Sequence, residues 1–297
     1  MLLKNKAVVI TGAGQGIGAA CAKGAALQGA SVMVNDVDAA RANATVDDIR
    51  AHGGKAIACV ANITDWEEAG RLIQTCIDTY GKIDGLVNNA ALFHRSRLDE
   101  FDPAVARALV DVNILGTLHC AAHAVKPMLA QGSGSIVNVT SDVHMGIPPY
   151  GIYGATKGAV ASMVYTWALE LAGTGIRVNA LSPSGATRMV VMSAEEEEEG
   201  NKRYAAAPPA ENNSPVVEFL LSDRSAEVTG QLVRTQGDYL FLYTHPALLV
   251  PPAIRSHWTA DAVIDVFGNE FKDRLVACGT FGMEALPVKV VQGYKAN

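Results

Sequence analysis

Cysteine is scarce in this sequence and is never paired by spacing. The five cysteines among 297 residues form no CxxC motif, and they are Cys21, Cys59, Cys76, Cys120 and Cys278. Because stable disulfides belong to oxidising compartments, this scatter indicates free thiols in a reducing cytoplasm. His119 and His123 lie four residues apart, a spacing that could suit a metal ion. Nothing near them completes a ligand set, so an ordinary helix face is favoured and no metal is expected.

The chain also lacks an excess of positive charge and a long apolar run. Its net charge is −6 and it has no basic patch, so nucleic acid and anionic membranes are poor candidate partners. No apolar run reaches membrane-spanning length, and the first expected strand starts close to Met1. We therefore expect neither a transmembrane helix nor a signal peptide. The apolar content of 49% suits a packed globule of this length.

Apolar runs rich in β-branched residues alternate with helical stretches along most of the chain. We expect strands at 6–10, 30–35, 55–60, 83–87, 135–139, 177–181 and 231–235. The helical stretches between them include 39–52, 65–80, 103–131 and 214–221. This alternation predicts an α/β fold with a doubly wound parallel sheet and helices on both faces. Ligands of such sheets bind at the carboxyl ends of the strands.

The regular pattern stops in residues 188–210, which contain five consecutive glutamates, Glu195–Glu199. Such a run is usually solvated and mobile. We expect a single domain over 1–236, with a flap over the substrate at about 187–210. Residues 237–297 are expected to form a C-terminal extension packed on the same domain. This extension contains one helix at 259–267, for which Thr259 is a plausible N-cap.

A glycine-rich corner follows the first expected strand. The run Thr11-Gly12-Ala13-Gly14-Gln15-Gly16-Ile17-Gly18 opens an alanine-rich helical stretch. Glycine lets the backbone approach an anion, and a helix N-terminus presents free N–H groups and a positive dipole end. A tight turn without a ligand would look the same, but placement at the start of a βαβ unit favours a phosphate site. The cofactor-binding candidates here are Gly12, Gln15, Gly16, Ile17 and Gly18.

Asp36 follows the second expected strand, where a carboxylate would accept hydrogen bonds from the ribose hydroxyls of adenosine. It would also repel a 2′-phosphate, and neither Gln15 nor Val37 offers a cation to bind one, so NAD is favoured over NADP. An ordinary strand-end aspartate is the alternative. Small or polar residues at two other strand ends would let a cofactor lie close to the backbone. These further candidates are Asn62, Ile63, Asn89, Ala90 and Ala91.

Tyr153 and Lys157 lie four residues apart at the start of an apolar helical stretch. This spacing puts the phenol and the ammonium on one helix face. An ammonium favours phenolate, but a base that works near neutrality must lose roughly three units from a phenol pKa of about 10. One lysine is unequal to that shift, and a second cation such as an oxidised nicotinamide ring could supply the rest. An incidental Tyr and Lys on a helix is the alternative.

Four motifs together resemble the short-chain dehydrogenase/reductase family, over about 6–235. They are the run Thr11–Gly18, the segment Asn88-Asn89-Ala90, Asn113, and Ser141 with Tyr153 and Lys157. The resemblance implies a Rossmann fold, a nicotinamide cofactor, taken here as NAD, and an Asn-Ser-Tyr-Lys catalytic set. It also implies a small-molecule substrate and a homodimer or homotetramer.

The same resemblance assigns roles to particular residues. Tyr153 would be the general acid/base, Ser141 would hold the substrate oxygen, and Lys157 would lower the pKa of Tyr153 and bind the nicotinamide ribose. Asn113 would seat a water for proton relay; taken from the sequence alone, it could also be a surface residue. The nicotinamide carboxamide would pack against Pro183, Gly185, Ala186 and Thr187.

The sequence departs from the family pattern at several places. Ala91 and Ser184 stand where glycine is usual, and Asn62 replaces a common aspartate. Ser141 lies twelve residues before Tyr153, where thirteen is frequent, so Thr140 is a fallback for the serine role. We expect residues on the substrate side to be mostly apolar. These candidates are His144, Met145, Ile147, Tyr150, Met189 and Met192.

The expected reaction is the NAD-dependent interconversion of a secondary alcohol and a ketone in the cytoplasm. Flexible methionines favour a hydrophobic substrate, a hydroxysteroid or a cyclic compound. The glutamate run would disfavour acyl-CoA, whereas the tail faintly resembles extensions of hydroxyacyl-CoA and hydroxysteroid members. A 3-hydroxyacyl-CoA dehydrogenase or 3-oxoacyl reductase is therefore an alternative. A non-catalytic nucleotide-binding scaffold or sensor is another, against which the intact Ser141, Tyr153 and Lys157 speak.

Overall fold

The structure, a computed structural model, describes residues 1–192, 194, 197–246 and 251–274. It divides into two compact units, Met1–Thr244 and His245–Asn297. In the second unit the helix α10 (Ala260–Gly268) begins after Thr259, whose hydroxyl accepts the Ala262 N–H at 3.1 Å. The helix expected at 259–267 is therefore present, with the expected N-cap.

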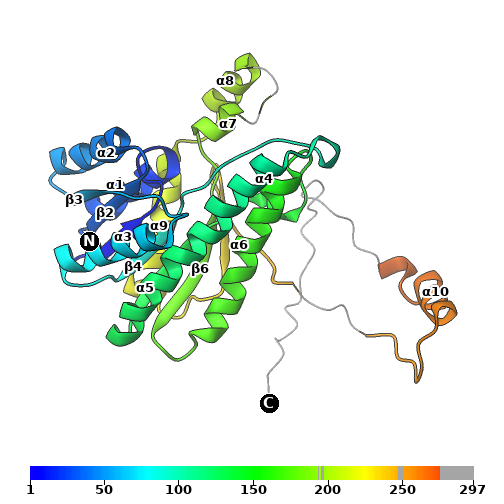
Figure 1. The fold of residues 1–297 in the computed structure, drawn as a ribbon. Coiled ribbons are helices and arrows are strands. Elements are labelled where there is room, and N and C mark those ends of the chain that lie inside the picture. The colour runs from blue at the N-terminus through cyan, green and yellow to red at the C-terminus, as the bar shows by residue number, and fades with distance from the viewer. Residues whose placement is uncertain (193, 195–196, 247–250, 275–297) are drawn as a thin grey trace. The chain divides into compact units, whose positions relative to one another are not determined.

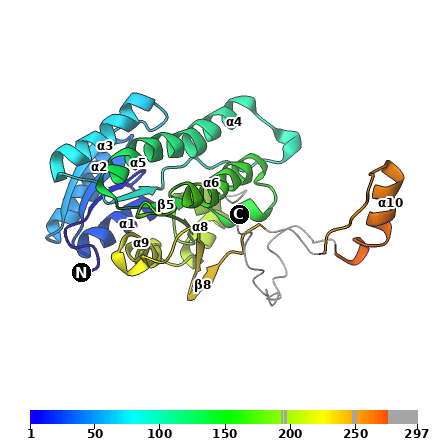
Figure 2. The same ribbon diagram turned by 90° about the horizontal axis from the view of Figure 1, so that it is seen from below.

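The first unit is built on an eight-stranded sheet in the order β3-β2-β1-β4-β5-β6-β7-β8 (Figures 1 and 2). The strands are β1 (Ala7–Ile10), β2 (Ser31–Asp36), β3 (Lys55–Val60), β4 (Gly85–Asn88), β5 (Gly134–Val139), β6 (Ile176–Ser182), β7 (Leu232–Gln236) and β8 (Tyr239–Leu242). The first seven strands run parallel, and β8 pairs antiparallel with β7. The strand order reverses at β1 and β4, which opens a crevice at their carboxyl ends. The predicted doubly wound Rossmann sheet is confirmed.

Helices cover both faces of this sheet, and alternate strand residues pack against each layer (Figure 2). The helices whose residues pack in these layers are α1 (Gly16–Leu27), α2 (Ala39–Ala51), α3 (Trp66–Tyr80), α5 (Thr117–Gln131), α6 (Gly151–Glu170) and α9 (Ser214–Leu221). Three further helices of this unit are α4 (Pro103–Leu109), α7 (Arg188–Met192) and α8 (Glu197–Ala206). In β1, Val9 packs in the cluster with α3, α5 and α6. Its neighbours Val8 and Ile10 pack in the cluster with α1, α2 and α9. The strands are thus apolar on both faces, as buried parallel strands must be.

The helix expected at 103–131 is continuous but changes its winding. A π-helical segment, Val110–Gly116, joins α4 to α5 and contains Asn113. The whole continuous helix, Pro103–Gln131, has 29 residues and is long and apolar enough to cross a membrane by length and composition alone. Buried side chains such as Cys120 and Met128 instead face the sheet in the first hydrophobic cluster. A core helix of a sheet-covering layer passes the same test, so it carries no membrane argument.

Two expectations about the later chain were wrong. The strand expected at 231–235 is present as β7, but it is not the last strand, because β8 follows it. Residues 188–210 are not irregular throughout, because they contain α7 and α8. In α8 Lys202 pairs with Glu198 at 2.7 Å, and Arg203 pairs with Glu199, which supports the helix at i,i+4 spacing. Glu195 and Glu196 lie outside the described residues.

Candidate active site

A cavity of about 650 Å³ lies at the carboxyl ends of the strands. That volume suits a cofactor and small-molecule site. It brings together all but one of the expected cofactor residues: Gly12, Gln15, Gly16, Ile17, Gly18, Asp36, Asn62, Ile63, Asn89, Ala90, Ala91, Tyr153, Lys157, Pro183, Gly185 and Thr187. The exception is Ala186, which lines a neighbouring cavity behind the glycine corner. Its N–H is turned away by a 2.7 Å bond to the Pro208 carbonyl.

The glycine corner packs too tightly for side chains. A Cβ on Gly12 would lie 2.7 Å from the Ala90 Cα, and one on Gly18 would lie 2.4 Å from the Gly12 carbonyl oxygen. Gly12 and Gly16 also have φ values of +59° and +58°, which favour glycine. Helix α1 begins here, and Gln15 makes no side-chain cap hydrogen bond within the described part of the chain. The first N–H groups of α1 therefore remain available to an anion.

Asp36 is held at the end of β2 as a preformed acceptor. Its Oδ2 accepts the Gly14 N–H at 3.0 Å and its Oδ1 accepts the Asp38 N–H at 3.1 Å. The carboxylate lines the cavity and is 8% exposed. Arg41 lines the same end and pairs with Asp38 at 3.2 Å. This cation was missed because the sequence argument looked only at Gln15 and Val37 and not at the first turn of the next helix.

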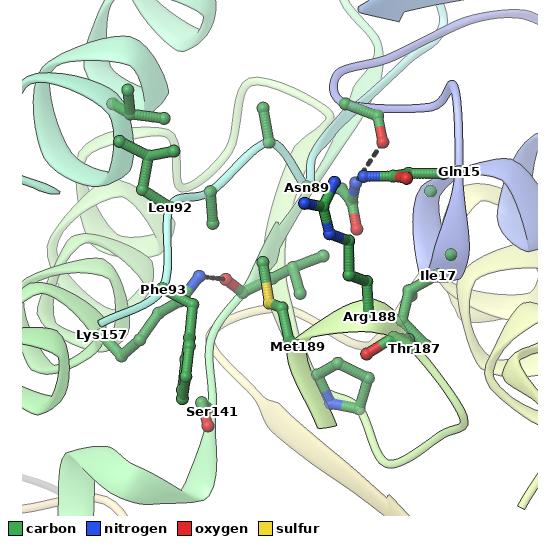
Figure 3. A pocket seen from close by; sticks show the side chains of 18 of the residues that line it. Gln15, Ile17, Asn89, Leu92, Phe93, Ser141, Lys157, Thr187, Arg188 and Met189 are labelled. Carbon is green, nitrogen blue, oxygen red and sulfur yellow. Dashed lines mark hydrogen bonds between the residues drawn. The ribbon is translucent and has the colours of Figure 1, made fainter. Parts of the chain in front are cut away.

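Asn89 fixes the strand end that faces the glycine corner. Its Nδ2 donates to the Thr11 and Gly12 carbonyls at 2.9 and 3.0 Å. The Thr11 hydroxyl in turn accepts the N–H groups of Asn89 and Ala90. Figure 3 shows Asn89 beside Gln15 on this side of the cavity. The side chain of Asn89 thus joins two strand ends, so only the backbone of Asn89 remains to contact a ligand.

Asn113 is buried and points away from the cavity. Its side-chain Oδ1 accepts the Leu92 N–H at 2.8 Å. Its side-chain Nδ2 donates to the Leu92 carbonyl and to the Thr156 hydroxyl, both at 3.0 Å. The backbone carbonyl of Asn113 accepts the Thr117 hydroxyl at 2.9 Å. The surface alternative is therefore wrong, since Asn113 is 1% exposed. In this geometry the side chain clamps the segment after β4, and its water-holding role stays a prediction.

Ser141 and its neighbour Thr140 differ in the hydrogen-bond partners of their hydroxyl groups. The Thr140 hydroxyl donates to the Lys157 carbonyl at 2.9 Å, and the side chain is buried. The Ser141 hydroxyl lines the cavity, where it donates to Asp142 Oδ1 at 3.2 Å. It also accepts the Val143 N–H at 3.5 Å as the cap of the 3₁₀ turn Asp142–Met145. Thr140 lines the cavity as well, but a buried backbone carbonyl takes its hydroxyl hydrogen, so Ser141 is the better candidate of the two for the serine role.

Tyr153 lies in the first turn of α6 and is 6% exposed. Its ring meets the ring of Phe93 edge to face, with centroids 5.0 Å apart. Burial raises the pKa of Tyr153, a hydrogen bond with Ser141 opposes that shift, and the nearby Asp142 and Tyr150 add to it. In the free protein the phenol therefore keeps its proton at neutral pH, which suits a general acid.

Lys157 follows on the same face of α6 and is fully enclosed. Its Nζ donates to the Val139 carbonyl at 2.8 Å and lies 5.8 Å from the centre of the Tyr153 ring. Burial lowers the pKa of Lys157 to about 8. The residue thus holds an ammonium at neutral pH, next to the phenol, at an energetic cost that the fold must carry.

The substrate side of the cavity only partly matches the expectation. Ile147, Tyr150 and Met189 line it, and Met192 lines a separate hollow with Phe93, His94 and Arg95. His144 and Met145 line neither. The His144 ring is turned away because its Nδ1 bonds the Ser141 carbonyl and its face meets Tyr243, with centroids 5.0 Å apart.

Comparison with known proteins agrees with this geometry. The sequence pattern of the short chain dehydrogenases matches residues 6–199. The chain belongs to the short chain dehydrogenase family. The 3-oxoacyl-[acyl-carrier-protein] reductase FabG of Thermotoga maritima is 35% identical over 247 residues, which are 80% of this chain and 98% of that protein.

Two solved structures resemble this short chain dehydrogenase. One is a short chain dehydrogenase from Mycobacterium avium, with a TM-score of 0.78 and 30% identity, over 90% of this chain and 96% of that one. The other is 7α-hydroxysteroid dehydrogenase with NADH and 7-oxo glycochenodeoxycholic acid, with a TM-score of 0.72 and 31% identity, over 80% of this chain and 94% of that one. The chain is an oxidoreductase that acts on CH–OH groups and uses a nicotinamide cofactor.

Several residues of this short chain dehydrogenase were missed by the sequence argument. They share a position just beyond or near a strand end, and they are Leu92, Phe93, Asp142, Arg188, Val190 and Arg234. The rule that ligands bind at strand carboxyl ends pointed to Phe93 and Asp142, which follow β4 and β5. Arg234 lies near the carboxyl end of β7, so the same rule applied to it, but nothing in the sequence pointed to its pairing with the distant Asp142.

Proposed function

We propose that this protein interconverts a secondary alcohol and a ketone with NAD, and that Tyr153 is its general acid/base. One observation carries the proposal: the phenol, the Ser141 hydroxyl and the Lys157 ammonium share one cavity with the glycine corner and Asp36. A scaffold or sensor without turnover would not need a buried ammonium beside a buried phenol.

The residues present fit a dinucleotide. The free N–H groups at the start of α1 suit its phosphates, and the tight packing at Gly12 and Gly18 holds this corner against the end of β4. Asp36 suits the adenosine ribose, and Lys157 suits the nicotinamide ribose. When bound, the cofactor supplies the redox chemistry. The chain itself orients the two partners and moves the proton.

The proton steps follow from the side chains. In reduction, Tyr153 Oη gives its proton to the ketone oxygen while Ser141 donates a hydrogen bond to that oxygen. In oxidation, Tyr153 takes the proton of the carbinol, for which it must first ionise. The Lys157 ammonium favours that ionisation through its positive charge.

Asp36 is expected to select NAD over NADP. Its carboxylate repels a 2′-phosphate and accepts the ribose hydroxyls that NAD offers. Asp36→Ala is expected to narrow the ratio of kcat/KM values for NAD and NADP by about tenfold, which corresponds to the loss of about one charge-assisted hydrogen bond. Equal use of the two cofactors by the unmutated protein would show that the assignment is mistaken.

Arg41 provides the matched control, since it is the cation at the same end of the cavity. Its guanidinium is paired with Asp38, so we expect Arg41→Ala to leave the preference of the unmutated protein unchanged. If Arg41→Ala instead abolishes residual use of NADP while NAD use persists, Arg41 and not Asp36 sets the choice.

The substrate is proposed to be a hydrophobic alcohol or ketone, a hydroxysteroid or cyclic compound. Apolar side chains surround the space next to Tyr153, and these are Leu92, Phe93, Val112, Val143, Ile147, Met189 and Val190. The ring of Phe93 lies against both Tyr150 and Tyr153, with centroids 5.6 and 5.0 Å away. Support also comes from the bile-acid ligand of the 7α-hydroxysteroid dehydrogenase relative.

Reduction of a 3-oxoacyl thioester is a second candidate, favoured by the charges near the cavity. His94 and Arg95 line the hollow next to Phe93 and Met192, and Arg188 lines the main cavity (Figure 3). The Arg95 and Arg188 guanidinium groups would suit the phosphates of an acyl carrier. Two glutamates of the acidic run are paired within α8, which weakens their repulsion of such a substrate. The FabG relative supports the same candidate.

A direct comparison separates the two candidates. We expect kcat/KM for a 7-oxo bile acid to exceed that for acetoacetyl-CoA by at least about tenfold, measured through NADH absorbance at low and at high salt. A preference for acetoacetyl-CoA that weakens with salt would instead favour the thioester, because salt screens exposed charges beyond about 8–10 Å.

We further propose a cytoplasmic protein that forms a homodimer or homotetramer. The buried free thiols of Cys21, Cys59, Cys76 and Cys120 support a reducing compartment. The end strand β8 supports self-association, because its four side chains are apolar and exposed on both faces.

A further inference from the structure

An ion pair lies beside Ser141 at the edge of the cavity. Arg234 Nη2 is 2.8 Å from Asp142 Oδ2, and the two side chains are only 14% and 26% exposed. Both residues line the main cavity, although Arg234 belongs to β7 and Asp142 directly follows Ser141. Partial burial makes such a pair costly to desolvate, and removal of one partner leaves a charge uncompensated.

The two oxygens of Asp142 have different tasks. Oδ2 meets Arg234, while Oδ1 accepts the hydroxyl of Ser141 at 3.2 Å. A serine hydroxyl has one hydrogen to donate. While that hydrogen points at Asp142, a substrate oxygen cannot use it. The strength of Asp142 as an acceptor therefore decides how readily Ser141 turns toward the substrate.

Arg234 is itself held in place by the end of the sheet. It donates to the Ser182 hydroxyl at 3.4 Å and to Gln236 Oε1 at 3.3 Å. Ser182 shares a 3.1 Å hydrogen bond with the Tyr243 hydroxyl, and Tyr243 meets the ring of His144. These contacts link the turn that follows Ser141 to the hairpin formed by β7 and β8.

We propose that Arg234 is a positioning residue that acts through Asp142 to direct the Ser141 hydroxyl and to ease proton loss from Tyr153. The inference rests on the roles proposed above for Ser141 and Tyr153. With Arg234 in place, the charge of Asp142 is partly balanced, so Asp142 holds the Ser141 hydrogen less firmly. Without Arg234, a bare carboxylate would compete with the substrate and would disfavour phenolate formation nearby.

The surroundings of Tyr153 set the sign of this effect. Burial is the largest cause of the raised pKa of Tyr153, and the hydrogen bond with Ser141 lowers that pKa. The negative charge of Asp142 raises it further. Tyr150 adds to the rise, and Lys157 lies on the same helix face. From other elements, Arg234 of β7 and Tyr243 after β8 face the Asp142 turn, and His144 is a titratable group within that turn.

The test uses charge changes of opposite sign at the two partners. The probe is NAD-dependent oxidation of glycochenodeoxycholate, followed as kcat/KM against pH. Arg234→Gln is expected to move the acid limb of that profile up by about one pH unit and to lower kcat about tenfold, with the KM for NAD unchanged. Asp142→Asn is expected to move the limb down. The double variant is expected to return close to the unmutated profile, and Arg234→Lys should lie between.

A merely structural role for Arg234 gives a different pattern. Loss of anchoring would lower kcat in Arg234→Gln without moving the limb, and Asp142→Asn would not rescue it; that result overturns the proposal. Gln236→Ala is the matched control, because it removes the side-chain amide that Arg234 contacts on its own strand and should leave the limb in place.

A second readout does not depend on turnover. The near-ultraviolet phenolate absorbance of the NAD-bound protein, minus that of Tyr153→Phe, titrates Tyr153 alone. Its midpoint is expected to rise in Arg234→Gln and to fall in Asp142→Asn. If glycochenodeoxycholate is not turned over but these midpoints move, the substrate proposal has failed and the Arg234 proposal stands. Unmoved midpoints overturn the latter.

Discussion

Replacement of Tyr153 with phenylalanine is expected to lower turnover by about 10²–10⁴-fold, or more, while NADH still binds. The substitution removes the proton that the ketone oxygen must receive. It keeps the ring, so the edge-to-face contact with Phe93 and the packing of the buried side chain are retained. Turnover is followed by NADH absorbance, and NADH affinity by fluorescence titration of the same sample.

Tyr165→Phe is the matched control, because Tyr165 lies on the same helix α6 but packs against the first hydrophobic cluster instead of the cavity. It should change neither quantity by more than about twofold. Near-normal turnover in Tyr153→Phe would exclude Tyr153 as the proton donor. A parallel loss of NADH binding would mean that the ring or its hydroxyl supports the cofactor site rather than the proton transfer.

The repetitive part of the fold was predictable because its signals are local. Alternate residues of β1 face opposite helix layers, so the strand reads as an unbroken apolar run in the sequence. The glycines at 12 and 18 mark places where a Cβ would collide with the neighbouring backbone or strand end. Asp65 caps α3 by accepting the Glu68 N–H at 2.9 Å, as its position before the helix suggests.

The parts that were not predictable depend on contacts between distant segments. β8 follows Gly237 and pairs with β7, but its residues Tyr239–Leu242 show no alternation of apolar and polar side chains to announce a half-buried strand. The pairing of Arg234 with Asp142 joins residues far apart in the sequence. The turn of His144 away from the cavity depends on Tyr243, which the sequence placed in a tail. Spacing rules carry no information about such pairs.

Replacement of Lys157 with methionine is expected to weaken NADH binding and at the same time to stabilise the free protein. Loss of a charge-assisted contact to the ribose should raise the Kd for NADH by about 10–100-fold. Burial lowers the pKa of Lys157 from 10.5 to about 8, so the folded state binds its proton less tightly than the unfolded chain does. Below pH 8 both states are protonated, and the full cost of the buried ammonium, about 3 kcal/mol, is present.

The sign of the pH dependence follows from that difference. Between pH 8 and 10.5 the unfolded chain holds the proton that the folded protein has lost, so the unfolding free energy of the unmutated protein rises with pH in this window. Methionine removes the cost but leaves the Val139 carbonyl without its 2.8 Å partner, which offsets about 1–2 kcal/mol. We expect a net gain of about 1–2 kcal/mol at pH 7 that shrinks above pH 8 and becomes a net loss of about 1–2 kcal/mol above pH 10.5, measured by urea unfolding.

The pH dependence of NADH binding should report the same ionisation of Lys157. The unmutated protein is expected to bind NADH progressively more weakly above pH 8, as Lys157 loses its charge, whereas Lys157→Met should bind weakly at every pH. Lys126→Met, at an exposed position of α5, should reproduce neither effect. A Lys157→Met protein that is less stable at pH 7 would contradict the argument, because the ammonium would then be a net support of the fold. A gain in stability with a loss of binding would identify Lys157 as a charge kept for function at the expense of stability.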